Sequence, residues 1–306
     1  MRKLLAIGLA AVLLMAIALP GAGAEENMNK GTLLVQYCTA NYELDKVLID
    51  PAGGMGYIIR TENGELFVID GGNTNDGYRF LQLLREVSGQ EKPHVSMWFL
   101  SHPHGDHYGA LKSIADTYAS QLTIDTILCN FPPRDTVDVI KSTSYASGNA
   151  ALTTILAATH AELVTPHTGE TYQIDNISID IVTTWEDLRQ INDPNETSTV
   201  LMVYAEGQKM LFLADAYPAT AQNVLKNYGD KLACDIVQVA HHGINGCKTA
   251  VYEQSGASLY LLPANRQTMD AMYGKYAPST WVYKNAPELI VGGDGTVLIS
   301  LPYRAE

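Results

Sequence analysis

The segment that most constrains this chain is Ser101-His102-Pro103-His104-Gly105-Asp106-His107, which directly follows the apolar run Val95 to Leu100. An apolar run of this length is typical of a buried strand. Four potential metal ligands therefore lie within six residues at a strand end, and three of the chain's eight histidines are among them. Imidazole and carboxylate groups suit Zn²⁺ and related cations. The segment predicts a metal site rather than a polar surface loop.

Two later strand ends carry further potential ligands. Asp215 ends the apolar run 211–214, and His241 and His242 follow the strand-like run 235–240. A single loop cannot enclose a cation, since metal sites draw three or four protein ligands around one ion. We therefore expect positions 102–107, 215 and 241 to converge in the folded chain.

Apolar runs and turn residues predict alternating strands and helices. Residues 57–59 and 66–69 flank Asn63-Gly64, a dipeptide typical of a hairpin turn. Apolar residues at helical spacing predict helices at 76–87, 108–117, 149–160 and 219–228. Further strands are expected at 33–37, 47–50, 122–129, 199–204, 209–213, 233–240, 258–262 and 296–301, with a hairpin over 172–183 and an irregular stretch at 130–148.

The pattern His-x-His-x-Asp-His after an apolar strand, followed by Gly109-Ala110, resembles the signature of the metallo-β-lactamase superfamily of hydrolases. The resemblance extends from about Gly54 to the C-terminus. It is strongest to the exported, stand-alone relatives of the hydrolase domain in the DNA-uptake protein ComEC. It implies an α/β fold, the four-layer αββα sandwich, in which two sheets pack face to face with helices outside. It also implies that Asp70 supports the metal loop from below, although an ordinary strand-end carboxylate is the alternative.

The resemblance further implies two metal ions that share Asp215. The first ion would be held by His102, His104 and Asp215. The second would be held by Asp106, His107, His241 and Asp215. His241 is the preferred last ligand because it is first off the strand, and the reverse assignment stays open. Catalytic roles fall to Asp106 and to His242, which would donate a proton or simply pack.

The chain departs from the family pattern at two of these positions. The usual Gly-Asp pair before the bridging ligand is Ala214-Asp215 here. Ile244 stands where ComEC-like sequences often carry a serine after His-His-Gly, so a phosphate contact from that position is in doubt.

A third departure is a missing histidine between the metal loop and Asp215, where lactamase-type members carry another ligand. His160 and His167 do not follow a strand at the expected place, so they and His94 are interpreted as structural or surface residues. Asn195 and Ser198 precede the next strand instead, as in ComEC-like sequences.

A metal-dependent hydrolase is the function that these residues favour. A bound cation lowers the pKa of its water toward about 7, which gives a metal-bound hydroxide at neutral pH. One or two Zn²⁺ ions are the preferred cofactor, and Mn²⁺ is the second choice because carboxylate ligands also suit it. The ComEC-like pattern favours a phosphodiester or phosphoester substrate.

Two alternative functions stay open. The same fold could hydrolyse a lactam, a lactone or a thioester, although the missing histidine and the ComEC-like last motif argue against β-lactamase action. The chain could also be a non-catalytic exported metal-binding protein that retains a relict site.

The N-terminus has the pattern of a secretory signal peptide. Arg2 and Lys3 precede the apolar run Leu4 to Leu19, and Ala22-Gly23-Ala24 offers a small-residue cleavage site. The run is shorter than the roughly 20 residues that a spanning helix needs. We therefore expect a signal peptide at 1–24, one hydrolase domain at 25–306, a secreted or extracytoplasmic location, and no stable membrane insertion after cleavage. An uncleaved anchor is the alternative.

The net charge limits the kinds of partner that we expect this protein to bind. The net charge is −13, and it becomes −15 without residues 1–24, which carry two basic residues and no acid. This balance favours a small-molecule or wall-associated phosphoester over long nucleic acid.

The four cysteines, Cys38, Cys129, Cys234 and Cys247, show no Cys-x-x-Cys spacing, which argues against a zinc ribbon. Their disulfide pairing cannot be read from sequence, but Cys129 and Cys234 lie in apolar runs and are expected to be buried thiols.

Overall fold

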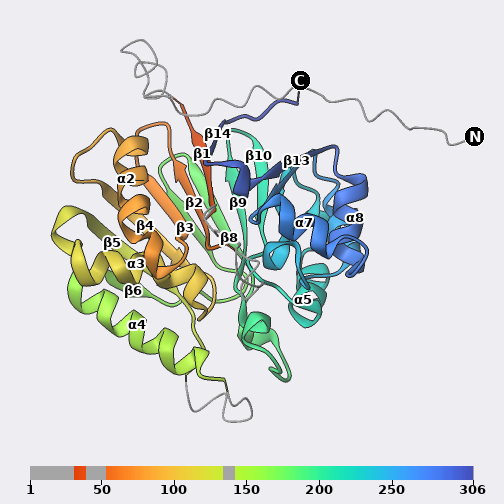
Figure 1. Ribbon diagram of the computed structural model, residues 1–306, viewed down its shortest axis with the longest axis horizontal. Helices are drawn as coiled ribbons and strands as arrows, with labels where there is room; N and C mark the ends of the chain where they lie inside the picture. The colour runs from red at the N-terminus through yellow and green to blue at the C-terminus, as the bar shows by residue number, and fades with distance from the viewer. Residues whose placement is uncertain (1–30, 39–52, 134–141, 306) are drawn as a thin grey trace, which may run out of the picture.

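The computed structural model describes residues 31–38, 53–133 and 142–305. They form two seven-stranded sheets that pack face to face, with helices on both outer surfaces (Figure 1). This arrangement confirms the predicted four-layer αββα sandwich. The predicted signal peptide at 1–24 and the strand expected at 47–50 lie outside the described residues.

The first sheet joins an antiparallel half to a parallel half. Its strands, in sheet order, are β14 (Val297–Ser300), β1 (Leu33–Cys38), β2 (Met55–Arg60), β3 (Leu66–Asp70), β4 (His94–Leu100), β5 (Thr123–Cys129) and β6 (Glu162–Val164). From β3 to β6 the neighbours are parallel. Because parallel neighbours end at the same edge of a sheet, the ends of β3 and β4 bring Asp70 and the metal loop together.

The second sheet is built in the same way. Its strands, in sheet order, are β13 (Glu288–Val291), β12 (Leu259–Leu262), β11 (Ile236–Gln238), β10 (Gln208–Phe212), β9 (Val200–Ala205), β8 (Ile177–Thr183) and β7 (Thr171–Ile174). The neighbours from β10 to β13 are parallel. Asp215, the His241-His242 pair and Pro263 follow three of these strands, so they leave the sheet at one edge.

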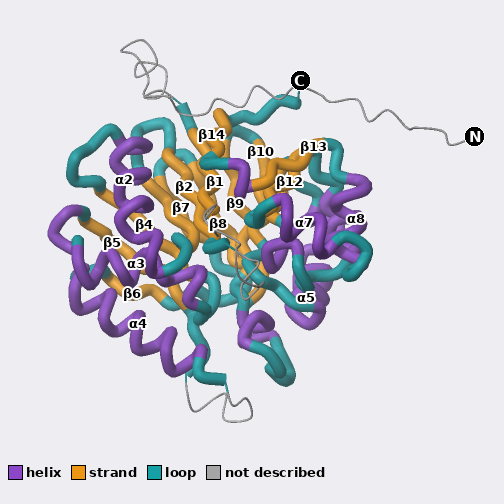
Figure 2. Tube along the Cα trace, in the orientation of Figure 1, coloured by secondary structure: helices purple, strands orange, loops and turns teal. Residues whose placement is uncertain are grey.

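Helices cover the outer face of each sheet (Figures 1 and 2). The first sheet carries α2 (Gly77–Ser88), α3 (Gly105–Thr117) and α4 (Ser144–Thr159). The second carries α5 (Pro218–Tyr228), α6 (Thr249–Ser255), α7 (Arg266–Met272) and α8 (Ala277–Asn285). The apolar face expected for the first of these helices is buried in the structure, at Phe80, Leu83, Leu84 and Val87.

Three apolar layers follow from the alternation of side chains along the strands. In β2, Tyr57 and Ile59 belong to the layer between the sheets, whereas Ile58 points to the layer beneath α2 and α3. A third layer lies between the second sheet and its helices and includes Val237 and Tyr252. The inner faces of the two sheets thus pack against each other through buried apolar side chains, which holds the strand ends in fixed positions.

The sequence-based boundaries differ from the structure at the elements around the metal loop. The helix expected from residue 108 begins at Gly105, because His104 is extended (φ −104°, ψ 145°) and takes the N-cap position. Asp106 and His107 therefore lie in the first turn of α3, not on a loop. The irregular stretch predicted at 130–148 is helical from Ser144 onward, and α6, α7 and α8 were not predicted.

The four cysteines form no disulfide with one another in the described structure. Burial raises the pKa values of Cys38, Cys234 and Cys247 to about 12 and also raises that of Cys129. Cys129 is fully buried as expected, and Cys234 is half-buried. Because the thiolate is the reactive form, these cysteines are inert packing groups.

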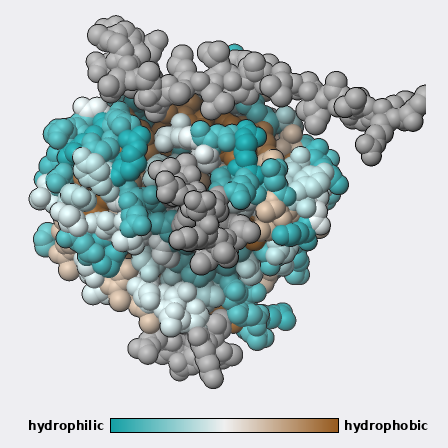
Figure 3. Space-filling view, in the orientation of Figure 1, coloured by the Kyte–Doolittle hydropathy of each residue, from teal (hydrophilic) through white to brown (hydrophobic). Residues whose placement is uncertain are grey.

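Hydrophilic and weakly polar residues cover most of the described surface on the face that Figure 3 shows. The large hydrophobic side chains exposed among the described residues are Tyr78, Leu163 and Tyr273. Within the same residues, no helix has the length and apolar character to cross a bilayer.

The close packing of α3 on the turn after β3 gives a stability prediction. A Cβ added at Gly109 would lie 2.5 Å from the Thr74 backbone nitrogen and 2.7 Å from the Asn73 carbonyl carbon. We expect Gly109→Ala to destabilise the protein by about 1–3 kcal/mol, since backbone atoms cannot move aside cheaply. Urea denaturation of the chelator-treated protein measures this change.

Gly105→Ala is the matched control, because it lies in the same helix and a Cβ there meets nothing within 4 Å. This control should leave stability unchanged or raise it slightly, as alanine favours helix. Equal midpoints for the two variants would contradict the packing argument.

Candidate metal centre

The site lies where the parallel strands of both sheets end. Four residues at these ends have left-handed backbone conformations: Asp70 (φ 56°), Ala214 (φ 48°), His241 (φ 48°) and His242 (φ 51°). Each such position costs a non-glycine residue about 1 kcal/mol or more. The turns redirect the chain sharply, so that side chains from β3, β4, β10 and β11 face one another.

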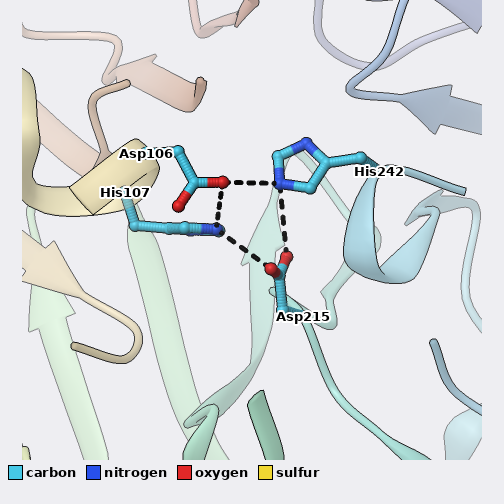
Figure 4. A group of neighbouring side chains, drawn as sticks. All are labelled: Asp106, His107, Asp215 and His242. Atoms are coloured by element: carbon cyan, nitrogen blue, oxygen red, sulfur yellow. Dashed lines mark ion pairs between the residues drawn. The ribbon is translucent and has the colours of Figure 1, made fainter. Parts of the chain in front are cut away.

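One group of potential ligands consists of Asp106, His107, Asp215 and His242 (Figure 4). The His107 Nε2 atom lies 3.3 Å from Asp215 Oδ2 and 3.7 Å from Asp106 Oδ2. The His242 Nε2 atom lies 3.2 Å from Asp106 Oδ2 and 3.6 Å from Asp215 Oδ1. All four side chains point to one centre, Asp106 and His107 from α3 and Asp215 and His242 from strand ends of the second sheet.

A second group consists of His102, His104 and Asp215, so the two groups share the Asp215 carboxylate. The His102 Nε2 atom lies 3.0 Å from His104 Nδ1 and 3.6 Å from Asp215 Oδ2. This group has three potential ligands among the described His, Cys, Asp and Glu residues, one fewer than the first.

His241 is near both groups but belongs to neither. Its Nε2 atom lies 3.9 Å from Asp215 Oδ2, and its Nδ1 atom is buried without a hydrogen-bond partner. Its ring packs edge-on against Tyr217, with centroids 5.1 Å apart. The structure thus brings His242, rather than the preferred His241, among the potential ligands, and it favours the reverse assignment that the sequence left open.

Asp70 and Ser101 orient the histidines of the metal loop. Asp70 accepts hydrogen bonds from the Ser101 backbone N–H (2.9 Å), the Ser101 hydroxyl (2.8 Å) and His107 Nδ1 (2.8 Å). Since the Ser101 hydroxyl donates to Asp70, it accepts from His102 Nδ1 at 3.0 Å. Both rings therefore carry a hydrogen on Nδ1 and turn Nε2 toward the cluster, so that Nε2 is the atom that would bind a cation. These contacts place Asp70 beneath the metal loop, as expected.

His242 is oriented in the same way by the next strand. Its Nδ1 atom lies 2.8 Å from the Pro263 carbonyl oxygen. A carbonyl oxygen can only accept, so Nδ1 donates and Nε2 is left to face Asp106 and Asp215. Pro263 follows β12, the parallel neighbour of β11, which is why its carbonyl reaches this ring.

The buried carboxylates and histidines of the cluster shift one another's pKa values. Burial acts to raise the pKa of Asp215, but His107, His242 and His241 outweigh it and hold that pKa well below the usual range. Burial acts to lower the pKa of His107, but Asp215, Asp106 and Asp70 together raise it well above the usual value. His102 has a pKa well below the usual value, because of burial and the neighbouring His107.

These residues fit a divalent cation. Three buried atoms that face the cluster, His107 Nε2, His242 Nε2 and Asp215 Oδ1, have no hydrogen-bond partner. Buried polar atoms without partners are rare and costly in native proteins. A donor set of imidazole nitrogens and carboxylate oxygens suits Zn²⁺, Mn²⁺ and iron.

The other histidines lie away from the cluster. His94 pairs with Asp125 at 2.9 Å, and His167 pairs with Glu186 at 2.8 Å on the surface. His160 is exposed at the end of α4 in a left-handed conformation. Their interpretation as structural or surface residues is confirmed.

Sequence reasoning missed two groups that shape the site. Ser101 links two ligand rings to Asp70, and the Pro263 carbonyl fixes the tautomer of His242. Their position in the sheets could have indicated both groups. Ser101 follows β4, which is parallel to the strand that ends in Asp70, and Pro263 follows β12, which is parallel to the strand before His242. Backbone carbonyls carry no residue-type signature, so Pro263 could be found only through the sheet order.

Comparison with known families agrees with this geometry. Residues 49–245 match the family described as the Metallo-beta-lactamase superfamily, which spans most of the chain and every potential ligand. The chain belongs to this superfamily. The prediction of a metallo-β-lactamase-fold enzyme is confirmed at that level. No curated protein matched the chain.

Solved structures share the fold at low sequence identity. Zn²⁺-bound PqqB from Methylobacterium extorquens is 11% identical with a TM-score of 0.55, covering 88% of this chain and 100% of PqqB. Tm1679, a metal-dependent hydrolase, is 11% identical with a TM-score of 0.50, covering 88% and 99%. CmlA, a diiron β-hydroxylase from Streptomyces venezuelae, is 14% identical with a TM-score of 0.50, covering 89% and 54%. At such identities the likeness establishes the fold and not the reaction.

The Asp70 contacts predict a role in metal affinity. Asp70→Asn removes the charge that fixes the tautomer of His107 and the orientation of Ser101. We expect Zn²⁺ affinity to fall about 10–100-fold, as measured by competition with a chromogenic chelator. Asp125→Asn, an exposed carboxylate that also pairs with a histidine, is the matched control and should bind Zn²⁺ like the wild type. Wild-type affinity in the Asp70 variant would refute the orienting role.

The raised pKa values of His107 and His242 predict pH-dependent metal binding. In the metal-free protein the carboxylates keep protons on these rings, against the effect of burial. A cation must displace those protons, so affinity should weaken as the pH falls from about 8 to about 6. Calorimetric titration in two buffers of different ionisation enthalpy should show protons released on binding. Affinity that is constant over this range would contradict the assignment.

Proposed function

We propose that this protein is an exported, metal-dependent hydrolase that cleaves a phosphodiester or phosphoester. The observation that carries the proposal is the pair of ligand groups that share the buried Asp215 carboxylate. Two cations bound there would activate a water molecule and neutralise charge on the attacked group. The non-catalytic alternative is less favoured, because every histidine of both groups already faces the cluster.

The residues would divide into holding and binding roles. His102, His104 and Asp215 would hold the first ion, and Asp106, His107, Asp215 and His242 the second. Zn²⁺ is the preferred ion and Mn²⁺ the second choice. His241 is left to face the substrate, because its side chain keeps 16% of its surface exposed. Burial lowers the pKa of His241, which favours the neutral ring, and a neutral ring has one N–H that could donate to a substrate oxygen.

Solvent reaches the cluster on the side of three partly exposed residues, His104, Asp106 and His241. A substrate oxygen approaching from this side would meet both groups, through His104 of the first and Asp106 of the second. The ComEC-like pattern of the ligands supports a phosphoester over a lactam, and the acidic net charge supports a small or wall-associated substrate over long nucleic acid.

Hydrolysis assays with the purified mature protein test the proposal. With Zn²⁺ or Mn²⁺ added, we expect turnover of bis-p-nitrophenyl phosphate and little loss of nitrocefin. Asp215→Asn should reduce the diester rate about a hundredfold or more, because it weakens both ion sites at once. The surface variant Asp116→Asn, which breaks only an exposed pair with Lys112, should retain wild-type rates.

The outcomes separate the three functions. Rapid nitrocefin hydrolysis without diester cleavage would show that the substrate is a lactam and not a phosphoester. Protein that binds no metal after Zn²⁺ exposure and hydrolyses none of the substrates would support a relict site.

A further inference from the structure

A buried glutamine joins the two turns that carry the potential ligands of the second sheet. Gln238 is the last residue of β11 and is 1% exposed. Its Oε1 atom accepts from the Leu213 backbone N–H at 2.7 Å, and its Nε2 atom donates to the carbonyl oxygens of Ala214 (3.1 Å) and Val239 (2.6 Å). One side-chain amide therefore makes three hydrogen bonds to the main chain on both sides of the site.

These bonds begin where the main-chain pairing of the two strands stops. The parallel pairing of β10 with β11 runs as far as Leu211 and Val237, and β10 ends at Phe212. The next residue, Leu213, is fully buried, and a buried main-chain N–H without a partner is costly. Gln238 supplies that partner, so its side chain continues the contact between the strands into the turn.

The Ala214 carbonyl oxygen is the point where the two turns meet. It accepts from Gln238 Nε2 and also from the His241 backbone N–H at 3.0 Å. Ala214 and His241 both have left-handed backbone conformations (φ 48°), which residues other than glycine rarely adopt. Alanine lacks the freedom of a glycine, so this turn depends on the contacts that hold the Ala214 carbonyl in place.

Asp215 is the ligand that these contacts orient. It directly follows Ala214, and its carboxylate belongs to both ligand groups and faces His242 (Figure 4). His242 follows three residues after Val239, whose carbonyl is the other acceptor for the Gln238 amide. A rotation of the Ala214 peptide would turn the shared carboxylate away from both groups at once.

We propose that Gln238 is a positioning residue for the metal centre, which holds the left-handed turn before Asp215 in its metal-binding conformation before a cation arrives. A ligand that is already held in place loses less conformational entropy on binding. The inference goes beyond the proposed hydrolysis, because it concerns metal affinity and does not depend on which bond is cleaved.

The Zn²⁺ affinity of the mature protein, measured by competition with a chromogenic chelator, tests the proposal. Gln238→Met keeps the length of the side chain and loses its three hydrogen bonds, so we expect affinity to fall about 10–100-fold. Gln208→Met is the matched control. Gln208 also bonds to the main chain through both polar atoms of its amide, but it contacts Tyr303 at the opposite end of β10. This control should bind Zn²⁺ like the wild type.

A second substitution separates positioning from a general loss of stability. Ala214→Gly removes the conformational penalty of the turn, so in the Gln238→Met background it should restore Zn²⁺ affinity by about threefold or more. In the wild type, where the turn is already held, the same substitution should change affinity by less than about twofold. A glutamine that only stabilised the fold would lower the melting temperature of the metal-free protein without this rescue at position 214.

Hydrogen exchange in the metal-free wild type gives a test that needs no variant, and it decides the question even if Gln238→Met fails to fold. The Leu213 amide donates to Gln238 Oε1, so NMR should find it protected from exchange before Zn²⁺ is added. Protection that develops only with Zn²⁺, wild-type affinity in Gln238→Met, an equal loss in Gln208→Met, or no rescue by Ala214→Gly would each overturn the inference. Turnover of bis-p-nitrophenyl phosphate tests the proposed function separately, since affinity and exchange are measured without substrate.

Discussion

The buried charge of Asp215 is the constraint on which the rest of this site depends. The carboxylate is 1% exposed, and four imidazole Nε2 atoms, from His102, His107, His241 and His242, approach its oxygens within 3.3–3.9 Å. An isolated carboxylate at such depth would be strongly unfavourable, so the surrounding rings and a cation are what make it tolerable. Every other feature of the centre serves to bring these rings to one carboxylate and to keep their lone pairs turned inward.

The fold meets this demand with parallel strands and strained turns. Two sheets end at a common edge, and left-handed residues at Asp70, Ala214, His241 and His242 turn the chain back there. Ala214 accepts the conformation without the freedom of the glycine usual in the family. Hydrogen bonds that the rings donate to Asp70, the Ser101 hydroxyl and the Pro263 carbonyl then fix which nitrogen of each ring faces the cluster. The strain is held because both faces of each sheet are buried.

The fold of this chain does not by itself select a reaction. Fold relatives include a Zn²⁺-bound protein, a metal-dependent hydrolase and a diiron hydroxylase, so the sandwich and its ligand edge do not fix one reaction.

The sequence by itself determined the groups that meet at the site, because ligand types at strand ends are local signals, and its resemblance to a known family implied the four-layer fold. The sequence alone indicates the ligand candidates in 102–107, at Asp215 and in the His241-His242 pair. Which histidine of that pair faces the cluster depended on two successive left-handed residues and on a carbonyl from the neighbouring strand. The hydrogen bond between His242 and the Pro263 carbonyl joins positions 21 residues apart, and the bond between Asp70 and His107 joins positions 37 apart. The Thr199–Ser101 hydrogen bond links residues of the two sheets. Only the packed sheets bring such groups together, since no local pattern of residues encodes a distance between separate strands.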